Sequence, residues 1–209
     1  MVLIKQFVSV IMLALVVSCS SNSTQKDISQ NTSIIPGKQV GAVTKKTTRA
    51  DLVTMFGESK LTDDVILEDK GTLSVPVTKV NLGKENNFTV VWEEDTRKSL
   101  LYVTDFGSAW KTPEGIGVGT PLKELNQKLG DFKLTGLGWD YGGFINLETT
   151  KLPQYQGKLS LRLAADEKAA KNHPKQYKAI LGDIEFSSTN PNWQPLDMKL
   201  AQMTVQFDE

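Results

Sequence analysis

The sequence predicts an α+β fold made of two tandem repeats, each a short helix followed by an antiparallel meander. Two segments with a common pattern predict the helices, and alternating apolar and polar residues after each segment predict the strands. An apolar run at the N-terminus and the polar stretch behind it place both repeats after an export signal and a tether. Helices gathered on one face of antiparallel strands give an α+β architecture.

The first 18 residues have the pattern of a bacterial lipoprotein signal peptide. Lys5 precedes the apolar run FVSVIMLALVV, and Ser18 closes it directly before Cys19, the single cysteine of the chain. A positive start, an apolar core of roughly 7–15 residues and a small residue at the cut are typical of an export signal. The run is shorter than the roughly 20 residues of a membrane-spanning helix. The alternative is an ordinary signal peptide with a coincidental cysteine.

The four residues ending at Cys19, VVSC, resemble the bacterial lipobox, in which the cysteine is acylated and becomes the first mature residue. The resemblance predicts a chain that carries palmitate and is held at the membrane of the cell envelope by lipid. Each buried CH₂ group contributes about 0.8 kcal/mol, so several acyl chains make the attachment effectively permanent. Ser20 follows the cysteine where enterobacterial proteins retained at the inner membrane have Asp, which favours the outer membrane.

The composition bounds the partners and the redox chemistry. Lys and Arg total 24 and Asp and Glu total 24, and loss of Lys5 with the signal leaves 23 basic against 24 acidic residues. No basic stripe of a nucleic-acid-binding protein is visible, so no nucleic-acid partner is predicted. With Cys19 acylated, the mature chain has no thiol for a disulfide or for thiolate chemistry, and its stability must come from a hydrophobic core.

A polar segment separates the lipid from the folded part. Residues 20–33 are rich in Ser, Asn, Thr and Gln and lack aromatic residues. Such a composition cannot bury enough surface to order itself, so residues 19–33 are predicted to be a lipidated flexible tether. The first α+β repeat is then expected at residues 34–108 and the second at residues 109–209.

Two similar segments predict the helices that open the repeats. VGAVTKKTTRADLVTMFG ends at Gly57 and GIGVGTPLKELNQKLG ends at Gly130, an offset of 73 residues (130 minus 57). In the second, Thr120 is a good N-cap and Pro121 suits the first helical position. Each helix is expected to end at its glycine in a left-handed conformation. The expected core-facing residues are Leu52, Val53 and Phe56 in the first helix, behind Thr47 or Thr48 as the cap, and Leu122, Leu125 and Leu129 in the second.

Strand patterns follow each helix. The predicted strands are residues 72–80, 88–92 and 99–104 in the first repeat, and residues 131–136, 143–149, 158–164, 182–188 and 197–207 in the second. Leu159, Leu161 and Leu163 alternate with polar residues, which is typical of an antiparallel sheet with one buried face. Residues 164–180 are rich in Ala and Lys and are predicted to be a surface insertion, with a short helix that ends before His173.

Three motifs carry a resemblance that covers most of the mature chain. GIGVGT (115–120), GLGWDYGG (136–143) and GDIEFSS (182–188), in this order, resemble a family of bacterial secreted proteins and lipoproteins. The two helix segments ending at Gly57 and Gly130 also resemble the β-lactamase-inhibitor-protein-like fold and the SmpA/OmlA lipoproteins of outer-membrane assembly. These resemblances imply a fold and repeat boundaries, and they bring no activity, substrate or catalytic residue with them.

The GLGWDYGG segment is the most distinctive candidate binding site. Trp139, Asp140 and Tyr141 lie between pairs of glycines, and aromatic residues around an acid can form a ledge for a sugar or a peptide. Trp110 is a further candidate for such a patch. The alternative is a tight connection whose Trp and Tyr fill the core and whose Asp140 bonds the turn backbone, with Trp110 packed over the sheet edge.

No catalytic residue, metal site or cofactor is predicted. His173, the only histidine, lies in a polar loop and is expected to be solvated, so no multi-histidine metal site can form. The patterns of a nucleophile elbow and a phosphate-binding loop are absent. A glycosidase needs two carboxylates roughly 5–10 Å apart, and Asp105, Asp140 and Glu148 are candidates by residue type alone.

Three functional hypotheses follow. The first is a non-enzymatic outer-membrane lipoprotein that binds an envelope protein through its sheet face or the 136–143 segment. The second is a glycan- or peptidoglycan-binding module that uses Trp139 and Tyr141, and the third is a cell-envelope hydrolase. A flat, partly apolar sheet face with buried aromatics favours the first. Exposed aromatics at a concave pocket favour the second, and two facing carboxylates favour the third.

Overall fold

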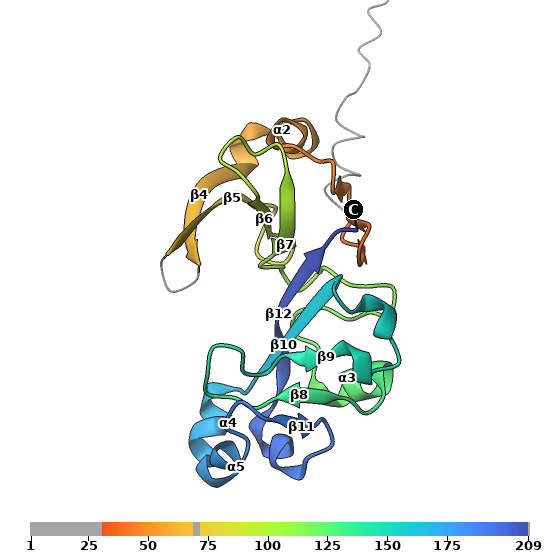
Figure 1. The fold of residues 1–209 in the computed structure, drawn as a ribbon, viewed down its shortest axis with the longest axis vertical. Coiled ribbons are helices and arrows are strands. Elements are labelled where there is room, and N and C mark those ends of the chain that lie inside the picture. The colour runs from red at the N-terminus through yellow and green to blue at the C-terminus, as the bar shows by residue number, and fades with distance from the viewer. Residues whose placement is uncertain (1–30, 69–71, 209) are drawn as a thin grey trace, which may run out of the picture.

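The computed structural model describes residues 31–68 and 72–208, which form an elongated α+β molecule (Figure 1). The predicted signal peptide, Cys19 and the tether up to residue 30 lie outside these residues. Over the described ranges, no helix has both the length and the apolar character that crossing a membrane requires. The last residues of the predicted tether already pair with the folded part. Ser33 forms a bridge with Lys111, and the next residue, Ile34, donates its N–H to the Lys111 carbonyl at 2.8 Å.

The elements follow the predicted order closely. The α-helices are α2 (Arg49–Phe56), α3 (Leu122–Leu129), α4 (Glu167–Asn172) and α5 (Pro174–Ala179), and the 3₁₀ segments are η1 (Glu58–Lys60), η3 (Leu147–Thr149), η4 (Pro153–Tyr155) and η5 (Pro191–Leu196). The strands are β1 (Ile34–Ile35), β2 (Gln39–Val40), β3 (Val43–Thr44), β4 (Leu61–Glu68), β5 (Leu73–Val80), β6 (Phe88–Trp92), β7 (Leu100–Thr104), β8 (Lys133–Thr135), β9 (Ile145–Asn146), β10 (Leu159–Ala164), β11 (Glu185–Ser187) and β12 (Lys199–Gln206).

One antiparallel sheet runs through both halves of the molecule. Its order is β10-β12-β7-β6-β5-β4, and β7 and β12 join the halves with Val103 opposite Val205. A second sheet, β11-β8-β9, continues from β10, because Phe144 forms a bridge with Arg162 and the Leu163 N–H donates to the Gly143 carbonyl at 2.8 Å. A third small sheet, β1-β2-β3, precedes α2. Because β12 pairs with β7 and the second sheet follows on from β10, the second half continues the sheet of the first.

The two longer helices share one hydrophobic core. Strand register places Val90, Val103 and Val205 on one face of the large sheet. These side chains form a single buried cluster with the apolar residues of both helices, Leu52 and Phe56 from α2 and Leu122, Leu125 and Leu129 from α3. Val75, Val77 and Val91 form a separate small cluster on the other face. The helices therefore cover one face of antiparallel strands, and the predicted α+β class is confirmed.

The two helix segments have the same local geometry at an offset of 73 residues. Each helix has eight residues, and each is preceded by a Thr that closes a turn with the residue three positions earlier. The Thr47 hydroxyl accepts from the Thr44 N–H at 2.9 Å, and the Thr120 hydroxyl accepts from the Gly117 N–H at 3.2 Å. Thr120 is therefore not the N-cap of α3. The helix begins at Leu122, one residue later than predicted, because the Thr120 hydroxyl is engaged in this turn.

The ends of the helices bear out the glycine prediction in part. Thr48 caps α2 in a reciprocal capping box with Asp51. Gly57 and Gly130 have φ of 84° and 76°, a region that side chains with a Cβ rarely adopt. Their ψ values of 143° and −168° lie outside the left-handed helical well that the sequence predicted. After Gly57 the chain enters the 3₁₀ segment η1, and after Gly130 it leads into β8.

Two elements differ from the sequence prediction. Strand β4 was not predicted, because its apolar and polar residues come in blocks instead of alternating, and it lies at the edge of the sheet. The insertion holds two helices instead of one. Helix α4 ends before His173 as expected, and Pro174 then starts α5, since proline is well suited to the first turn of a helix.

Candidate functional site

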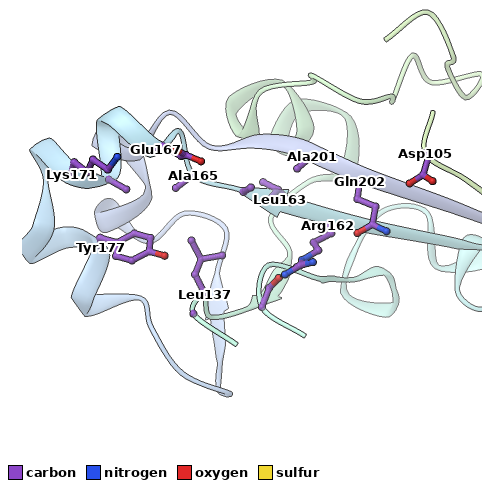
Figure 2. Close-up of a pocket in the computed structure, with 14 residues that line it drawn as sticks. Asp105, Leu137, Arg162, Leu163, Ala165, Glu167, Lys171, Tyr177, Ala201 and Gln202 are labelled. Carbon is purple, nitrogen blue, oxygen red and sulfur yellow. The ribbon is translucent and has the colours of Figure 1, made fainter. Parts of the chain in front are cut away.

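A cleft of about 820 Å³ opens between the helices α4 and α5, the strands β10 and β12, and the 136–143 loop (Figure 2). Its larger side chains are Asp105, Leu137, Arg162, Leu163, Glu167, Lys171, Tyr177 and Gln202. Between them lie small residues, namely Gly138, Gly142, Ala164, Ala165, Ala170 and Ala201. The volume is within the range of about 300–1,000 Å³ that is usual for small-molecule sites.

A β-bulge forms the floor of the cleft. Arg162 pairs with Gln202, but the next residue, Leu163, pairs with Leu200, so Ala201 is the extra residue in β12. A bulge redirects side chains at the point where it interrupts the ladder. Here Arg162 and Gln202 lie side by side on the floor, with Ala201 next to them (Figure 2).

The 136–143 loop is fixed to the insertion by its backbone. The Leu137 N–H donates to the Ile180 carbonyl at 2.8 Å, and the Leu137 carbonyl accepts from the Gly182 N–H at 3.0 Å. A Cβ at Gly136 would lie 2.5 Å from the Gly182 carbonyl oxygen, so only glycine allows this approach. The GLGWDYGG and GDIEFSS motifs therefore meet through their first glycines, and they hold one wall of the cleft in place.

Trp139 and Tyr141 are at the surface. They are 36% and 66% exposed, and their rings meet edge to face at 5.5 Å between centroids. The Trp139 indole N–H donates to the Gly136 carbonyl at 3.0 Å, which fixes the ring on its own loop. Neither ring fills the core, in contrast to the alternative considered from the sequence. The rings do not line the cleft themselves, because the loop faces it with Gly138 and Gly142.

The turn within this loop is closed by Thr135, a residue that sequence reasoning missed. Its hydroxyl donates to the Tyr141 carbonyl at 2.6 Å and accepts from the Phe144 N–H at 3.0 Å. The alternative interpretation of this segment assigned the role to Asp140, but Asp140 is an exposed residue at the tip. A threonine directly before a glycine-rich turn is the only sequence feature that points to this contact.

Trp110 belongs to the core and not to the candidate site. It is 2% exposed, its ring packs edge to face against Phe88 at 5.1 Å, and its indole N–H donates to the Asn86 carbonyl at 3.0 Å. The hydrogen-bonded tryptophan is thus satisfied inside the protein and has no surface to offer a ligand. The prediction that included Trp110 in a binding patch is wrong for this reason.

The carboxylates suggested for catalysis are dispersed. Of the three, only Asp105 lines the cleft, and its φ of 54° is unusual for a residue with a side chain. Asp140 lies at the loop tip, and Glu148 lies in the exposed η3 turn. His173 is exposed between α4 and α5. Within the described ranges, no group of three or more His, Cys, Asp or Glu side chains is placed to hold a metal ion.

A second hollow of about 580 Å³ lies between α3 and η5 and has a different chemistry. Most of its polar side chains are neutral, namely Asn126, Ser188, Thr189, Asn190 and Gln194. Asn126 Oδ1 is buried there and has no hydrogen-bond partner within the described part of the chain. Trp193 forms part of the wall, but it is buried and its indole N–H donates to the Ser187 carbonyl at 2.9 Å.

Comparison of the chain with protein-family models, with curated proteins and with solved structures found no match.

Proposed function

We propose that the protein is a non-catalytic, lipid-anchored module of the cell envelope that binds a saccharide at the cleft beside the 136–143 loop. The exposed pair of Trp139 and Tyr141 next to the cleft carries the proposal. Rigid aromatic faces bind the apolar faces of sugar rings, and a tyrosine hydroxyl can form a hydrogen bond with a sugar hydroxyl. Both rings stand on a loop that backbone hydrogen bonds fix to the insertion, so little ordering is needed on binding.

The arrangement of acids in the cleft supports binding more than hydrolysis. Asp105 and Glu167 are the carboxylates that line it. They lie at opposite ends of the cleft in Figure 2, and Arg162 and Gln202 lie between them. A glycosidase instead needs two carboxylates that face each other across the scissile bond.

A glycan-binding measurement with two matched variants tests the proposal. The full chain, purified in mild detergent, is screened against an oligosaccharide array. Replacement of both Trp139 and Tyr141 by Ala should lower binding of any hit by tenfold or more, because stacked aromatic residues dominate such contacts. The control is Val65→Ala with Leu67→Ala, which also removes exposed apolar area but lies on β4. Equal loss in both variants, or no hit for the wild type, would contradict the proposal.

A protein partner is a second candidate function, supported by a different surface. Val65, Leu67 and Leu73 are 50%, 68% and 53% exposed on the hairpin β4–β5, and β4 is an edge strand of the sheet. Edge strands with exposed apolar side chains are sites where another chain can pair. A photocrosslinking residue at position 65 should then give one recurrent envelope protein in cells, and the same residue at position 141 should not.

We also infer that the two helix-led halves are tandem copies. The equal helix lengths, the matching Thr47 and Thr120 turns and the positive φ of Gly57 and Gly130 all recur at the offset of 73 residues. Each helix is followed by four antiparallel strands in meander order, β4–β7 in the first half and β8, β9, β10 and β12 in the second. This order supports the predicted resemblance to the β-lactamase-inhibitor-protein-like fold.

A further inference from the structure

The charges in the cleft differ from those elsewhere on the molecule. The chain has three arginines. Arg49 and Arg97 both contact the carboxylate of Asp63, at 3.0 and 3.6 Å. Arg162 has no carboxylate within 4.0 Å among the described residues, although it is only partly exposed. A partly buried arginine without an acidic partner is unusual, since charged side chains away from water are normally paired.

Arg162 is nevertheless held in a fixed orientation. Its Nε–H donates to the Gly142 carbonyl at 2.8 Å, and its guanidinium carbon lies 5.5 Å from the centroid of the Phe144 ring. Neither of its two terminal nitrogens has a hydrogen-bond acceptor in the described chain. The four N–H donors on these nitrogens therefore remain available, and Figure 2 shows the side chain on the floor of the cleft beside Gln202.

The other charges that line the cleft do not neutralise Arg162. Glu167 and Lys171 have opposite charges one turn apart on the opposite wall, α4. Asp105 lies at the far end of the cleft, and Tyr177 adds a neutral hydroxyl to the wall. Arg162 is thus a fixed cation in a concave site, where an anion would gain an interaction that is stronger than at an open surface.

We propose that the ligand is an acidic saccharide and that its carboxylate binds the terminal nitrogens of Arg162. A planar guanidinium forms two parallel hydrogen bonds to a carboxylate, and this geometry selects planar anions. The alanines and glycines between the charged residues leave room for a sugar ring in the cleft. The inference rests on the proposed saccharide function and specifies its ligand class. It gives Arg162 a role separate from that of the Trp139–Tyr141 pair.

Calorimetry with two matched tetrasaccharides tests the inference. One is a uronic-acid tetramer, and the other is the neutral hexose tetramer with the same linkages. Both are titrated into the full chain in mild detergent. The wild type should bind the acidic tetramer at least tenfold more tightly than the neutral one. Arg162→Gln should lower affinity for the acidic tetramer at least tenfold more than it lowers affinity for the neutral one, because charge-assisted hydrogen bonds are worth roughly a factor of ten or more.

Further arms separate the alternatives. Arg162→Lys keeps the charge but not the planar fork, so it should recover only part of the preference, and a thermal melt of each variant verifies folding. If the wild type binds both tetramers equally and Arg162→Gln changes neither affinity, the inference of an acidic ligand is overturned, while the saccharide function still stands. Binding of neither tetramer would overturn both. Complete displacement of the acidic tetramer by inorganic phosphate, with no effect of Trp139→Ala and Tyr141→Ala, would overturn the inference in favour of a simple anion site.

Discussion

The two halves of the molecule have the same order of elements but different connections between their strands. The first half is helix α2 with strands β4–β7, and the second is helix α3 with strands β8, β9, β10 and β12. Seven residues, 93–99, join β6 to β7, whereas 34 residues, 165–198, join β10 to β12. In the chain order, the link between β4 and β5 likewise corresponds to the 136–143 loop between β8 and β9. Both walls of the cleft are thus enlarged connections on a shared frame. The helices and strands of both halves contain the hydrophobic core that stabilises the fold, whereas the candidate binding site is formed mainly by the connections between strands.

The largest expected effect tests whether the two helices are equivalent in the core. Leu52 and Leu125 lie at matching positions, and both are fully buried. Leu→Ala at either site should lower the free energy of unfolding by about 2–5 kcal/mol, because each change removes buried methyl groups and leaves a cavity. Denaturant unfolding measures both variants. A large loss at one site and almost none at the other would break the equivalence.

An intermediate effect is expected at the helix ends. Gly57→Ala and Gly130→Ala should each lower stability by about 1–3 kcal/mol, because a Cβ disfavours the observed positive φ. At Gly130 the added Cβ would also lie 3.1 Å from Lys151 Cε, a flexible atom that can move away. Gly130→Val should cost more than Gly130→Ala. Unchanged melting temperatures for both Ala variants would show that these glycines do not end the helices for conformational reasons.

The smallest expected effect sharpens a difference between the halves. Arg49 hydrogen-bonds Glu58 and Asp63, whereas its counterpart in α3 is Leu122. The hydrogen bond from Arg49 lowers the pKa of Glu58. Burial acts to raise the pKa of Asp63, but the hydrogen bonds from Arg49 and Thr78 outweigh it and lower this pKa as well.

Acid titration of stability measures this difference. A lowered carboxylate pKa in the folded state contributes stability above the ordinary values of 3.8 and 4.5, and this contribution is lost as the pH falls through the folded values. The wild type should therefore lose more stability between pH 5 and about pH 2.5 than Arg49→Met does. The effect is small, since both carboxylates are partly exposed to solvent, which weakens the ion pairs. Parallel curves for the two proteins would show that the ion pairs contribute nothing.

Many of the helices and strands could be predicted from the local sequence, whereas the residues of the cleft could not. The strands 88–92 and 159–164 and the ends of both helices could be predicted because alternation, spacing and glycine act over a few residues. Trp110 and Trp139 show the limit, since both lie close to glycines in the sequence and yet one is in the core and the other is at the surface. Nothing in the sequence singled out Arg162, because its lack of an acidic partner depends on residues that only the fold brings together.

The two ends of the described chain meet at one end of strand β12. The Gly37 N–H donates to the Gln206 carbonyl at 3.2 Å, and the Gly37 carbonyl accepts from the Asp208 N–H at 2.8 Å. Ala201 and Gln202, in the cleft, lie toward the other end of the same strand. Eight residues of strand span roughly 25 Å. A lipid anchor at Cys19 and a tag at the C-terminus would therefore both join the folded part at the end of β12 that lies away from the cleft.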